Sequence, residues 1–437
     1  MTPPAAIGEA HIKSGNVPQV KSLYDFVFMP GRSLSGTRTN FVPAIHGIVF
    51  SGETVVAVTG SERFSQNSCV IAASLIRIHT QYVWKIMKAV LGLEDGTYIA
   101  GTGFGVEGES RGELVFTTQM TGYMEALTDP SYFGQILLFT YPLIGNYGVD
   151  LKNFQAKKLW ALGVIAREIC NTPSTGIPMI RYFEDNGLLG MHGVDTRMIT
   201  IKTRVMGTLR AALVVGDDNG EYAVECAKRT PPISDEELIP AVSCREPYRV
   251  EGRGKKIAVI DLGIKKNMVI SLRKRDADVY VYPHDATPDD IRGCDPDALF
   301  ISNGPGDPVH ATHAIRCVKE LAGSLPVFGI CMGNQVCGIA LGGETYKMKF
   351  GHRGTNQPVR TIEGKIFITT QNHGYAVAAD TLPEGCRISF SNVNDGTVEG
   401  FEDKHLDLAT VQFHPEAHGG PRDTESYFFD SMFRRLS

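Results

Sequence analysis

The sequence predicts an α/β protein with a β-rich N-terminal α/β domain and a C-terminal domain built on a doubly wound parallel sheet. From residue 256 onward, short apolar runs alternate with stretches of helical periodicity, which is typical of a parallel sheet covered by helices. Before residue 246, apolar runs are separated by turn residues such as Glu94-Asp95-Gly96, which favours hairpins. A chain of 437 residues is long enough for two separate cores.

Composition narrows the possible partners. Hydrophobic residues make up 43% of the chain and charged residues 21%, as in ordinary globular proteins, and the net charge of -5 gives no basis for nucleic-acid binding. We also expect no membrane span, because no uncharged apolar stretch is long enough to cross a bilayer. The nine cysteines form no Cys-x-x-Cys pair, so we expect neither a disulfide framework nor a bound metal. These features favour a reducing, cytoplasmic location.

The C-terminal part contains four expected strands, and the ends of two of them are of chemical interest. The strands are expected at residues 256–261, 279–282, 298–302 and 326–330, with helices ending near residue 275 and running from about residue 310 to residue 321. In doubly wound folds, sites form at the carboxyl ends of the strands. Cys331 lies at one such end, and the loop from Asn303 to Pro308 lies at another.

Cys331 is predicted to sit on a sharp turn between a buried strand and a helix. Gly329 and Gly333 flank it and are expected to permit the tight turn and the close approach of a substrate. The free N–H groups and the dipole of the following helix favour a thiolate. The pattern follows the logic of a nucleophile elbow, although a buried structural cysteine would look the same on this segment alone.

A candidate base for this thiol lies far downstream, in Val411-Gln412-Phe413-His414-Pro415-Glu416. The segment opens as a strand, and residues i and i+2 of an extended chain share a face. His414 and Glu416 are therefore expected on one face, with Glu416 orienting the imidazole and His414 serving as base to Cys331.

Gly329-Ile-Cys331-Met-Gly333-Asn-Gln335, taken with His414-Pro-Glu416, resembles the class I (triad) glutamine amidotransferases. Over roughly residues 88 to 437, the surrounding sequence resembles the family of carbamoyl-phosphate synthetase small subunits. This resemblance implies a flavodoxin-like amidotransferase domain and a Cys331–His414–Glu416 triad. Asn334 departs from the family, which commonly has histidine at that position.

The loop Asn303-Gly304-Pro305-Gly306-Asp307-Pro308 has two interpretations. It is either a plain tight turn or part of an oxyanion hole, in which Gly304 presents its N–H without a side chain in the way. We favour the oxyanion hole, with the N–H of Met332 as the second donor. Gly306 of the same loop is included among the candidate glutamine-binding residues.

Further glutamine-binding residues are expected on other segments. Gln335 lies one helical turn beyond Cys331 and can reach the same pocket. The resemblance implies that Asn372, Gly374 and Tyr375 hold the α-amino and α-carboxylate ends of glutamine, and that the serine of Asp129-Pro130-Ser131 reaches the same site. Without the resemblance, Ser131 is equally well explained by a surface turn. His352 and His373 are expected to be structural.

The resemblance implies a function for the whole chain. It would release ammonia from L-glutamine and pass it to a large subunit, which would use ATP and Mg to make carbamoyl phosphate from bicarbonate for arginine and pyrimidine biosynthesis. This chain shows no ATP-binding pattern and is expected to hold no cofactor itself. The alternatives are a stand-alone cysteine hydrolase acting on γ-glutamyl peptides, a catalytically silent docking protein and a flavodoxin-like cofactor binder.

Domain boundaries complete the predictions. The N-terminal domain is expected over residues 87–245, a polar linker over 246–255 and the amidotransferase domain over 256–437. The resemblance does not cover residues 1–86, which we expect to be a loosely attached or disordered extension or the result of a mis-assigned start. A small extra domain is the alternative, although inconsistent patterning argues against it.

Overall fold

The computed structural model describes residues 47–51, 54–58, 86–417 and 419–437. The chain divides into two compact units, Met1–Val83 and Trp84–Ser437. In the first unit, strands β1 (Gly47–Ser51) and β2 (Thr54–Val58) form an antiparallel pair. The rest of residues 1–85, for which a loosely attached extension was predicted, lies outside the described residues. Within the described part of the chain, no helix combines the length and apolar character that a membrane span requires.

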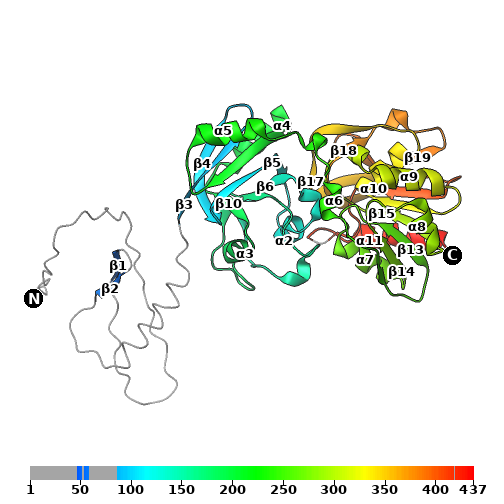
Figure 1. The fold of residues 1–437 in the computed structure, drawn as a ribbon, viewed down its shortest axis with the longest axis horizontal. Coiled ribbons are helices and arrows are strands. Elements are labelled where there is room, and N and C mark those ends of the chain that lie inside the picture. Colours follow the sequence, from blue (N-terminus) through cyan, green and yellow to red (C-terminus); the bar gives the residue numbers. More distant parts are fainter. Residues whose placement is uncertain (1–46, 52–53, 59–85, 418) are drawn as a thin grey trace, which may run out of the picture. The chain divides into compact units, whose positions relative to one another are not determined.

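The first half of the second unit is a closed barrel with the strand order β10-β4-β3-β11-β5-β6-β8 (Figure 1). Its strands are β3 (Met87–Leu93), β4 (Tyr98–Gly105), β5 (Gly108–Thr117), β6 (Gln135–Phe139), β8 (Gly163–Ile165), β10 (Leu189–His192) and β11 (Leu209–Val215), beside a small β7 (Leu143–Ile144) and β9 (Glu168–Ile169) pair. The helices are α2 (Tyr123–Leu127), α3 (Met179–Asp185), α4 (Thr196–Met206), α5 (Gly220–Arg229) and α6 (Ile239–Val242), with 3-10 turns η1 (Pro130–Tyr132), η2 (Leu151–Asn153) and η3 (Ile233–Asp235). The β-rich character predicted for this half is confirmed.

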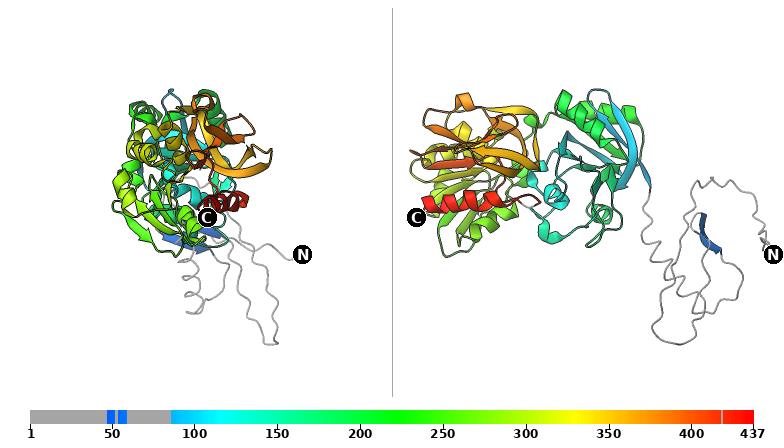
Figure 2. Two further views of the ribbon diagram at one scale, coloured as in Figure 1. Left: turned by 90° about the vertical axis from the view of Figure 1, so that its right-hand side faces the viewer. Right: turned by 180° about the vertical axis from the view of Figure 1, so that it is seen from behind.

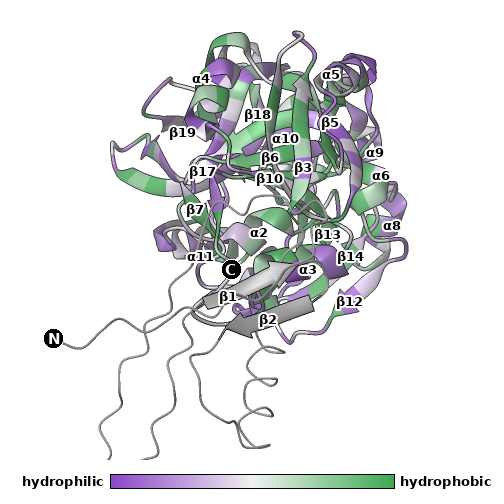
Figure 3. Cartoon of the chain, turned by 90° about the vertical axis from the view of Figure 1, so that its left-hand side faces the viewer, coloured by the Kyte–Doolittle hydropathy of each residue, from purple (hydrophilic) through white to green (hydrophobic). Residues whose placement is uncertain are grey.

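Local sequence explains how the barrel starts. The hairpin expected at Glu94–Gly96 joins β3 to β4, and Gly96 adopts the positive φ of 93° that favours glycine. The stretch Gly103–Gly108 has the Gly-x-Gly-x-x-Gly spacing of dinucleotide-binding turns. Such a turn requires a helix after it, but strand β5 follows here, so this stretch cannot form one. Helices α4 and α5 cover the barrel and carry both hydrophobic and hydrophilic residues (Figure 3).

The second half is a ten-stranded sheet with the order β12-β14-β13-β15-β16-β21-β20-β19-β17-β18. The strands are β12 (Tyr248–Val250), β13 (Lys256–Ile260), β14 (Asp278–Tyr282), β15 (Ala298–Ile301), β16 (Val327–Ile330), β17 (Thr345–Thr361), β18 (Ile366–Val377), β19 (Cys386–Asn392), β20 (Val398–Asp403) and β21 (Leu408–Val411). The helices are α7 (Lys266–Arg273), α8 (Pro288–Gly293), α9 (Thr312–Leu321), α10 (Met332–Ala340) and α11 (Asp423–Arg435), with 3-10 turns η4 (Pro308–His310) and η5 (Ala379–Thr381). Strands β14, β13, β15 and β16 pair in parallel, as predicted, and β21 adds a fifth parallel strand that was not predicted.

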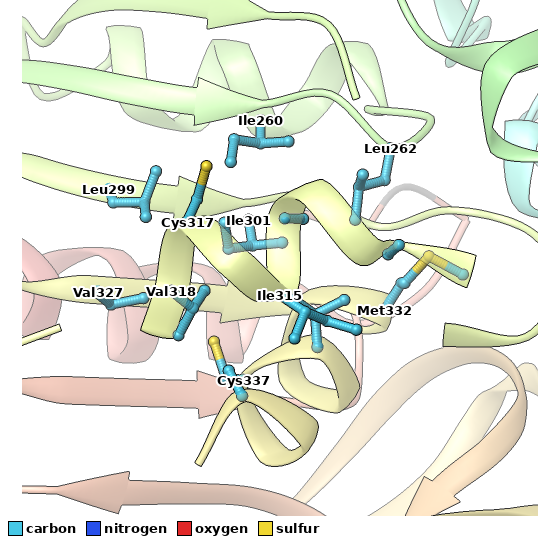
Figure 4. Packing of buried hydrophobic residues seen from close by; sticks show 14 of the residues in the cluster. Ile260, Leu262, Leu299, Ile301, Ile315, Cys317, Val318, Val327, Met332 and Cys337 are labelled. Carbon is cyan, nitrogen blue, oxygen red and sulfur yellow. The ribbon is translucent and has the colours of Figure 1, made fainter. Parts of the chain in front are cut away.

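Helices cover both faces of the parallel strands. Alternate residues of β13 point to opposite sides: Ile257 and Val259 pack with α7 and α11, whereas Ala258 and Ile260 pack with α8, α9 and α10. Figure 4 shows the second of these cores, in which side chains of α9 and α10 meet those of the strands. Figure 2 shows α11 at the C-terminal end of the chain alongside this sheet. The doubly wound arrangement is therefore present.

The structure adds features that were not predicted. Strands β17 and β18 form a long antiparallel arm that pairs with β19 and lies beyond the parallel core. The segment expected as a linker contains β12, which pairs with β14. Strand β21 ends at Val411, so the residues after it do not form the extended run that was expected.

Candidate active site

Cys331 occupies the predicted elbow. Strand β16 ends at Ile330, α10 begins at Met332, and Cys331 between them has φ 58° and ψ −105°. A positive φ is uncommon for a residue with a side chain and costs free energy, so the surroundings must hold it in place. The hydrogen bond from the N–H of Cys331 to the carbonyl of Val411, at 2.9 Å, is one such restraint.

The two glycines of the elbow, Gly329 and Gly333, allow neighbouring backbone segments to pack closely and do not open space for a substrate. A Cβ on Gly329 would lie 2.6 Å from the backbone of Gly333, and a Cβ on Gly333 would lie 2.2 Å from the carbonyl oxygen of Ile301. Neither residue has a positive φ. The expectation that they make room for a substrate is therefore wrong, because Gly329 faces the first turn of α10 and Gly333 faces the end of β15.

His414 and Glu416 meet through a turn. His414 forms a single backbone bridge to Thr370 of β18, and its carbonyl accepts from the N–H of Ala417. Its Nδ1 lies 2.8 Å from Oε1 of Glu416, with both side chains fully buried. The predicted pairing of these residues is present, although it depends on this turn and not on alternation along a strand.

The charges around His414 favour its protonated form. Burial and Lys265 both lower the pKa of His414, but Glu416 and Cys331 outweigh them and raise it to about 9. Burial raises the pKa of Glu416, while Lys265 and His414 lower it to about 2. The Nε2 of His414 is buried and has no hydrogen-bond partner of ordinary geometry within the described ranges, so it is free to exchange a proton with a reacting group.

Lys265 is a buried charged neighbour of the His414–Glu416 pair that the sequence reasoning missed. It follows β13 at the carboxyl edge of the sheet, and its Nζ lies 2.7 Å from Oε1 of Glu416 and 3.8 Å from Oδ2 of Asp129. Burial lowers the pKa of Lys265, but Glu416 and Asp129 reverse that effect and raise it. The position at a strand end was the only signal in the sequence, since lysine has no motif there.

A pocket opens beside the sulfur of Cys331, with an empty volume of about 490 Å³ that is partly open to solvent. Seven of the predicted glutamine-binding residues line it: Ser131, Gly304, Gly306, Gln335, Asn372, Gly374 and Tyr375. Met332 does not line it. Its sulfur instead lies 2.9 Å from the place where a Cβ on Gly304 would be, so the two proposed oxyanion donors belong to adjoining segments.

Hydrogen bonds fix several of these pocket side chains. Gln335 donates from Nε2 to the carbonyl of Tyr375 at 2.8 Å and to Gln412 at 3.1 Å. Asn303 donates from Nδ2 to Oγ of Ser131 at 2.9 Å. The pocket is therefore assembled from elements of both halves of the unit.

Charged residues that were not predicted also line the pocket. Glu113 of β5 accepts from Lys347 of β17 at 2.7 Å and from Thr208 at 2.8 Å. Arg353 is almost fully buried and donates to the carbonyl of Phe350 at 2.7 Å. These groups give the pocket both signs of charge, which suits a zwitterionic ligand.

His352, His373 and Glu399 form a buried cluster whose candidate ligand atoms lie within 4.8 Å of one another. Hydrogen bonds account for the contacts, because His352 faces Asp395 at 2.9 Å and Glu399 at 3.3 Å. Burial lowers the pKa of His373 well below its usual value. His352 thus has the contacts of a structural residue, whereas His373 also lines the pocket beside Cys331.

Asn334 points away from the pocket. It is fully buried, donates from Nδ2 to Gln412 at 3.0 Å and accepts from Oγ1 of Thr410 at 2.8 Å. Its role is therefore to join α10 to β21 and the residues that follow it.

A buried thiol on an elbow, an imidazole paired with a carboxylate and a doubly wound sheet define a class I glutamine amidotransferase domain. The model of the family described as "Glutamine amidotransferase class-I" matches residues 258–434. The model described as "Carbamoyl-phosphate synthase small chain, CPSase domain" matches residues 91–213.

Curated relatives extend the match over both halves. The chain is 54% identical over 364 residues to the carbamoyl phosphate synthase small chain of Methanosarcina mazei, covering 80% of this chain and 99% of the relative. It is 46% identical over 349 residues to that of Archaeoglobus fulgidus, covering 79% and 97%, and 44% identical over 352 residues to that of Clostridium perfringens, covering 80% and 99%. The chain belongs to the family of carbamoyl phosphate synthase small chains, the glutamine-hydrolysing subunits of a ligase.

Proposed function

We propose that this chain releases ammonia from L-glutamine through Cys331, His414 and Glu416 and delivers it to a separate large chain. The observation that carries the proposal is that the buried His414–Glu416 pair lies near enough to Cys331 for the sulfur to raise the pKa of the imidazole, while Cys331 itself lines the polar pocket. Membership of the small-chain family supports the same chemistry.

The reaction is an acyl transfer in two halves. His414 first takes the thiol proton of Cys331, which gives a thiolate beside an imidazolium, and the thiolate then attacks the side-chain amide carbon of glutamine. The C–N bond then breaks as His414 gives that proton to the leaving nitrogen, which departs as ammonia and leaves a γ-glutamyl thioester. His414 next takes a proton from water, which attacks the thioester and releases glutamate, and the thiol is restored.

Other groups support these steps. Glu416 holds the imidazole through Nδ1, which leaves Nε2 for the reacting atoms. The N–H groups of Gly304 and Met332 would stabilise the developing oxyanion. Ser131, Gly306, Gln335, Asn372, Gly374 and Tyr375 would hold the amino-acid end of glutamine.

The large chain would use ATP, Mg and bicarbonate to convert the ammonia into carbamoyl phosphate, in pathways to arginine and pyrimidines. We expect this chain to form a hetero-oligomer with it and to hold no cofactor of its own. A catalytic thiol requires a reducing compartment, so we place the complex in the cytoplasm.

Ammonia release, measured while the large chain is titrated into this chain, tests the proposal. We expect slow release by this chain alone and a large rise that saturates at a fixed ratio of the chains. A complex with Cys331→Ala should still make carbamoyl phosphate from added ammonium but not from glutamine. No stimulation and no co-purification would argue against a large-chain partner, and glutamine-dependent activity in the Cys331→Ala complex would overturn the assigned nucleophile.

A further inference from the structure

Asp129 of the barrel half lies among residues of the amidotransferase half. Its side chain is 4% exposed and sits directly before the turn η1. Oδ1 accepts from the N–H of Ser131 at 2.9 Å, and Oδ2 accepts from Nδ2 of Asn372 at 3.2 Å. One carboxylate therefore binds a pocket residue from each half of the unit.

Two further contacts surround the same carboxylate. Nδ2 of Asn303 lies 3.4 Å from Oδ1, and Nζ of Lys265 lies 3.8 Å from Oδ2. All four neighbours present donors, and Asn303 and Lys265 are themselves buried. A buried carboxylate encircled by donors is held in one position and holds its donors in return.

The neighbouring backbone shows that the two halves meet closely at this point. A Cβ on Gly263, in the loop after β13, would lie 3.2 Å from Cβ of Pro130 and 3.3 Å from Cα of Gly304. The N–H of Lys266 donates to the carbonyl of Gln155 at 2.7 Å. The Asp129-Pro130-Ser131 corner is thus seated against the loops that carry Lys265 and Gly304.

We propose that Asp129 is a positioning residue for glutamine, through which the barrel half holds Ser131 and Asn372 in the conformation that binds the substrate. It need not touch glutamine, since it acts through those two side chains. The inference rests on the proposed glutaminase function and adds that the pocket is incomplete without the barrel half.

Asp129→Asn tests the proposal because it keeps the size of the side chain but replaces an acceptor oxygen with a donor amide. The substitution weakens the hydrogen bonds by which the charged carboxylate holds Ser131 and Asn372, so glutamine should bind less tightly. We expect the KM for glutamine to rise about tenfold or more. A merely structural defect would reduce the active fraction, which lowers the apparent kcat and leaves KM unchanged.

Asp150→Asn is a matched control. Asp150 precedes η2 and accepts from the N–H of Lys152 at 2.9 Å, in the same capping geometry, but on an exposed turn outside the pocket lining. Glutamine-dependent ammonia release is measured for the parent chain and both variants, each with the large chain present. KM should rise in Asp129→Asn and stay at the parent value in Asp150→Asn.

A KM within twofold of the parent in folded Asp129→Asn would overturn the inference, whatever happens to kcat. If that variant does not fold, Asp129→Glu, which keeps the charge but moves it by one methylene, is judged by the same criterion. Failure of the proposed function would look different, because the parent chain itself would then release no ammonia from glutamine.

Discussion

The ammonium group of Lys265 and the Nδ1 of His414 meet the same oxygen of Glu416, Oε1, at 2.7 Å and 2.8 Å. The carboxylate is therefore shared between a cation that is always charged at neutral pH and an imidazole that must gain and lose a proton. Lys265 lowers the pKa of both His414 and Glu416. Its effect on His414 opposes that of Glu416 and Cys331, which favour the imidazolium.

Removing this cation should shift the titration of the imidazole. In Lys265→Met we expect the pKa of His414 to rise further, because the lysine lowers it in the parent. NMR titration of the imidazole signals measures this shift. Lys266→Met is the control, since Lys266 is the next residue and is exposed. An unchanged or lowered pKa in Lys265→Met would contradict the assigned field.

The His414–Glu416 pair should stabilise the fold most strongly between about pH 4.5 and pH 6.5. The folded pKa of His414 is raised from 6.5 to about 9, so its contribution is complete below 6.5 and lost as the pH rises through about 9. The folded pKa of Glu416 is lowered from 4.5 to about 2, so its contribution is complete above 4.5 and lost as the pH falls through about 2.

Urea unfolding checks this window. Glu416→Gln should lower the free energy of unfolding more at about pH 5.5 than at about pH 9.5, because the imidazolium partner is lost at the higher pH. Glu320→Gln, which removes an exposed carboxylate paired with Arg316 on α9, controls for the loss of a surface charge. Equal losses for Glu416→Gln at both pH values would refute the coupling.

Replacing the nucleophile should abolish hydrolysis. In Cys331→Ala we expect glutamine hydrolysis to fall to background, a loss on the order of 10⁶-fold, because no other group can form the thioester. A glutamine-like chloroketone should label the parent chain and fail to label this variant, as mass spectrometry would show. Cys386→Ala, at a half-buried cysteine of β19, should retain both labelling and activity. Labelling of Cys331→Ala at the parent rate would place the reactive thiol elsewhere.

A single methyl group at Gly304 should damage the oxyanion loop. Its Cβ would lie 2.3 Å from the carbonyl oxygen of Leu262 and 2.9 Å from the sulfur of Met332, so the loop must move. We expect Gly304→Ala to lower kcat by about 10²-fold or more, as when an oxyanion donor is lost. Gly293→Ala, where nothing lies within 4 Å of the added Cβ, should have parent activity. Parent-like kcat in a folded Gly304→Ala would remove Gly304 from the mechanism.

The sequence alone determined the elbow at Cys331, the first four parallel strands and the position of the Asn303–Pro308 loop at the end of one of them. Each depends on short-range rules: apolar runs of strand length and helical spacing after Met332. The resemblance to a family then assigned roles to Ser131 and Asn372 that their local chemistry did not.

Only the tertiary structure decided how charge is arranged around the catalytic groups. Lys265 carries no motif, and the sequence singled out only the serine of Asp129-Pro130-Ser131. The charge arrangement comes from two halves of the unit meeting, so that a strand-end lysine lies between the carboxylates of Asp129 and Glu416. The arm of β17 and β18 is a hairpin of consecutive strands, and only the structure shows that it joins the sheet through β19. Periodicity reports which side of an element is buried, whereas the field at His414 depends on which elements are buried against each other.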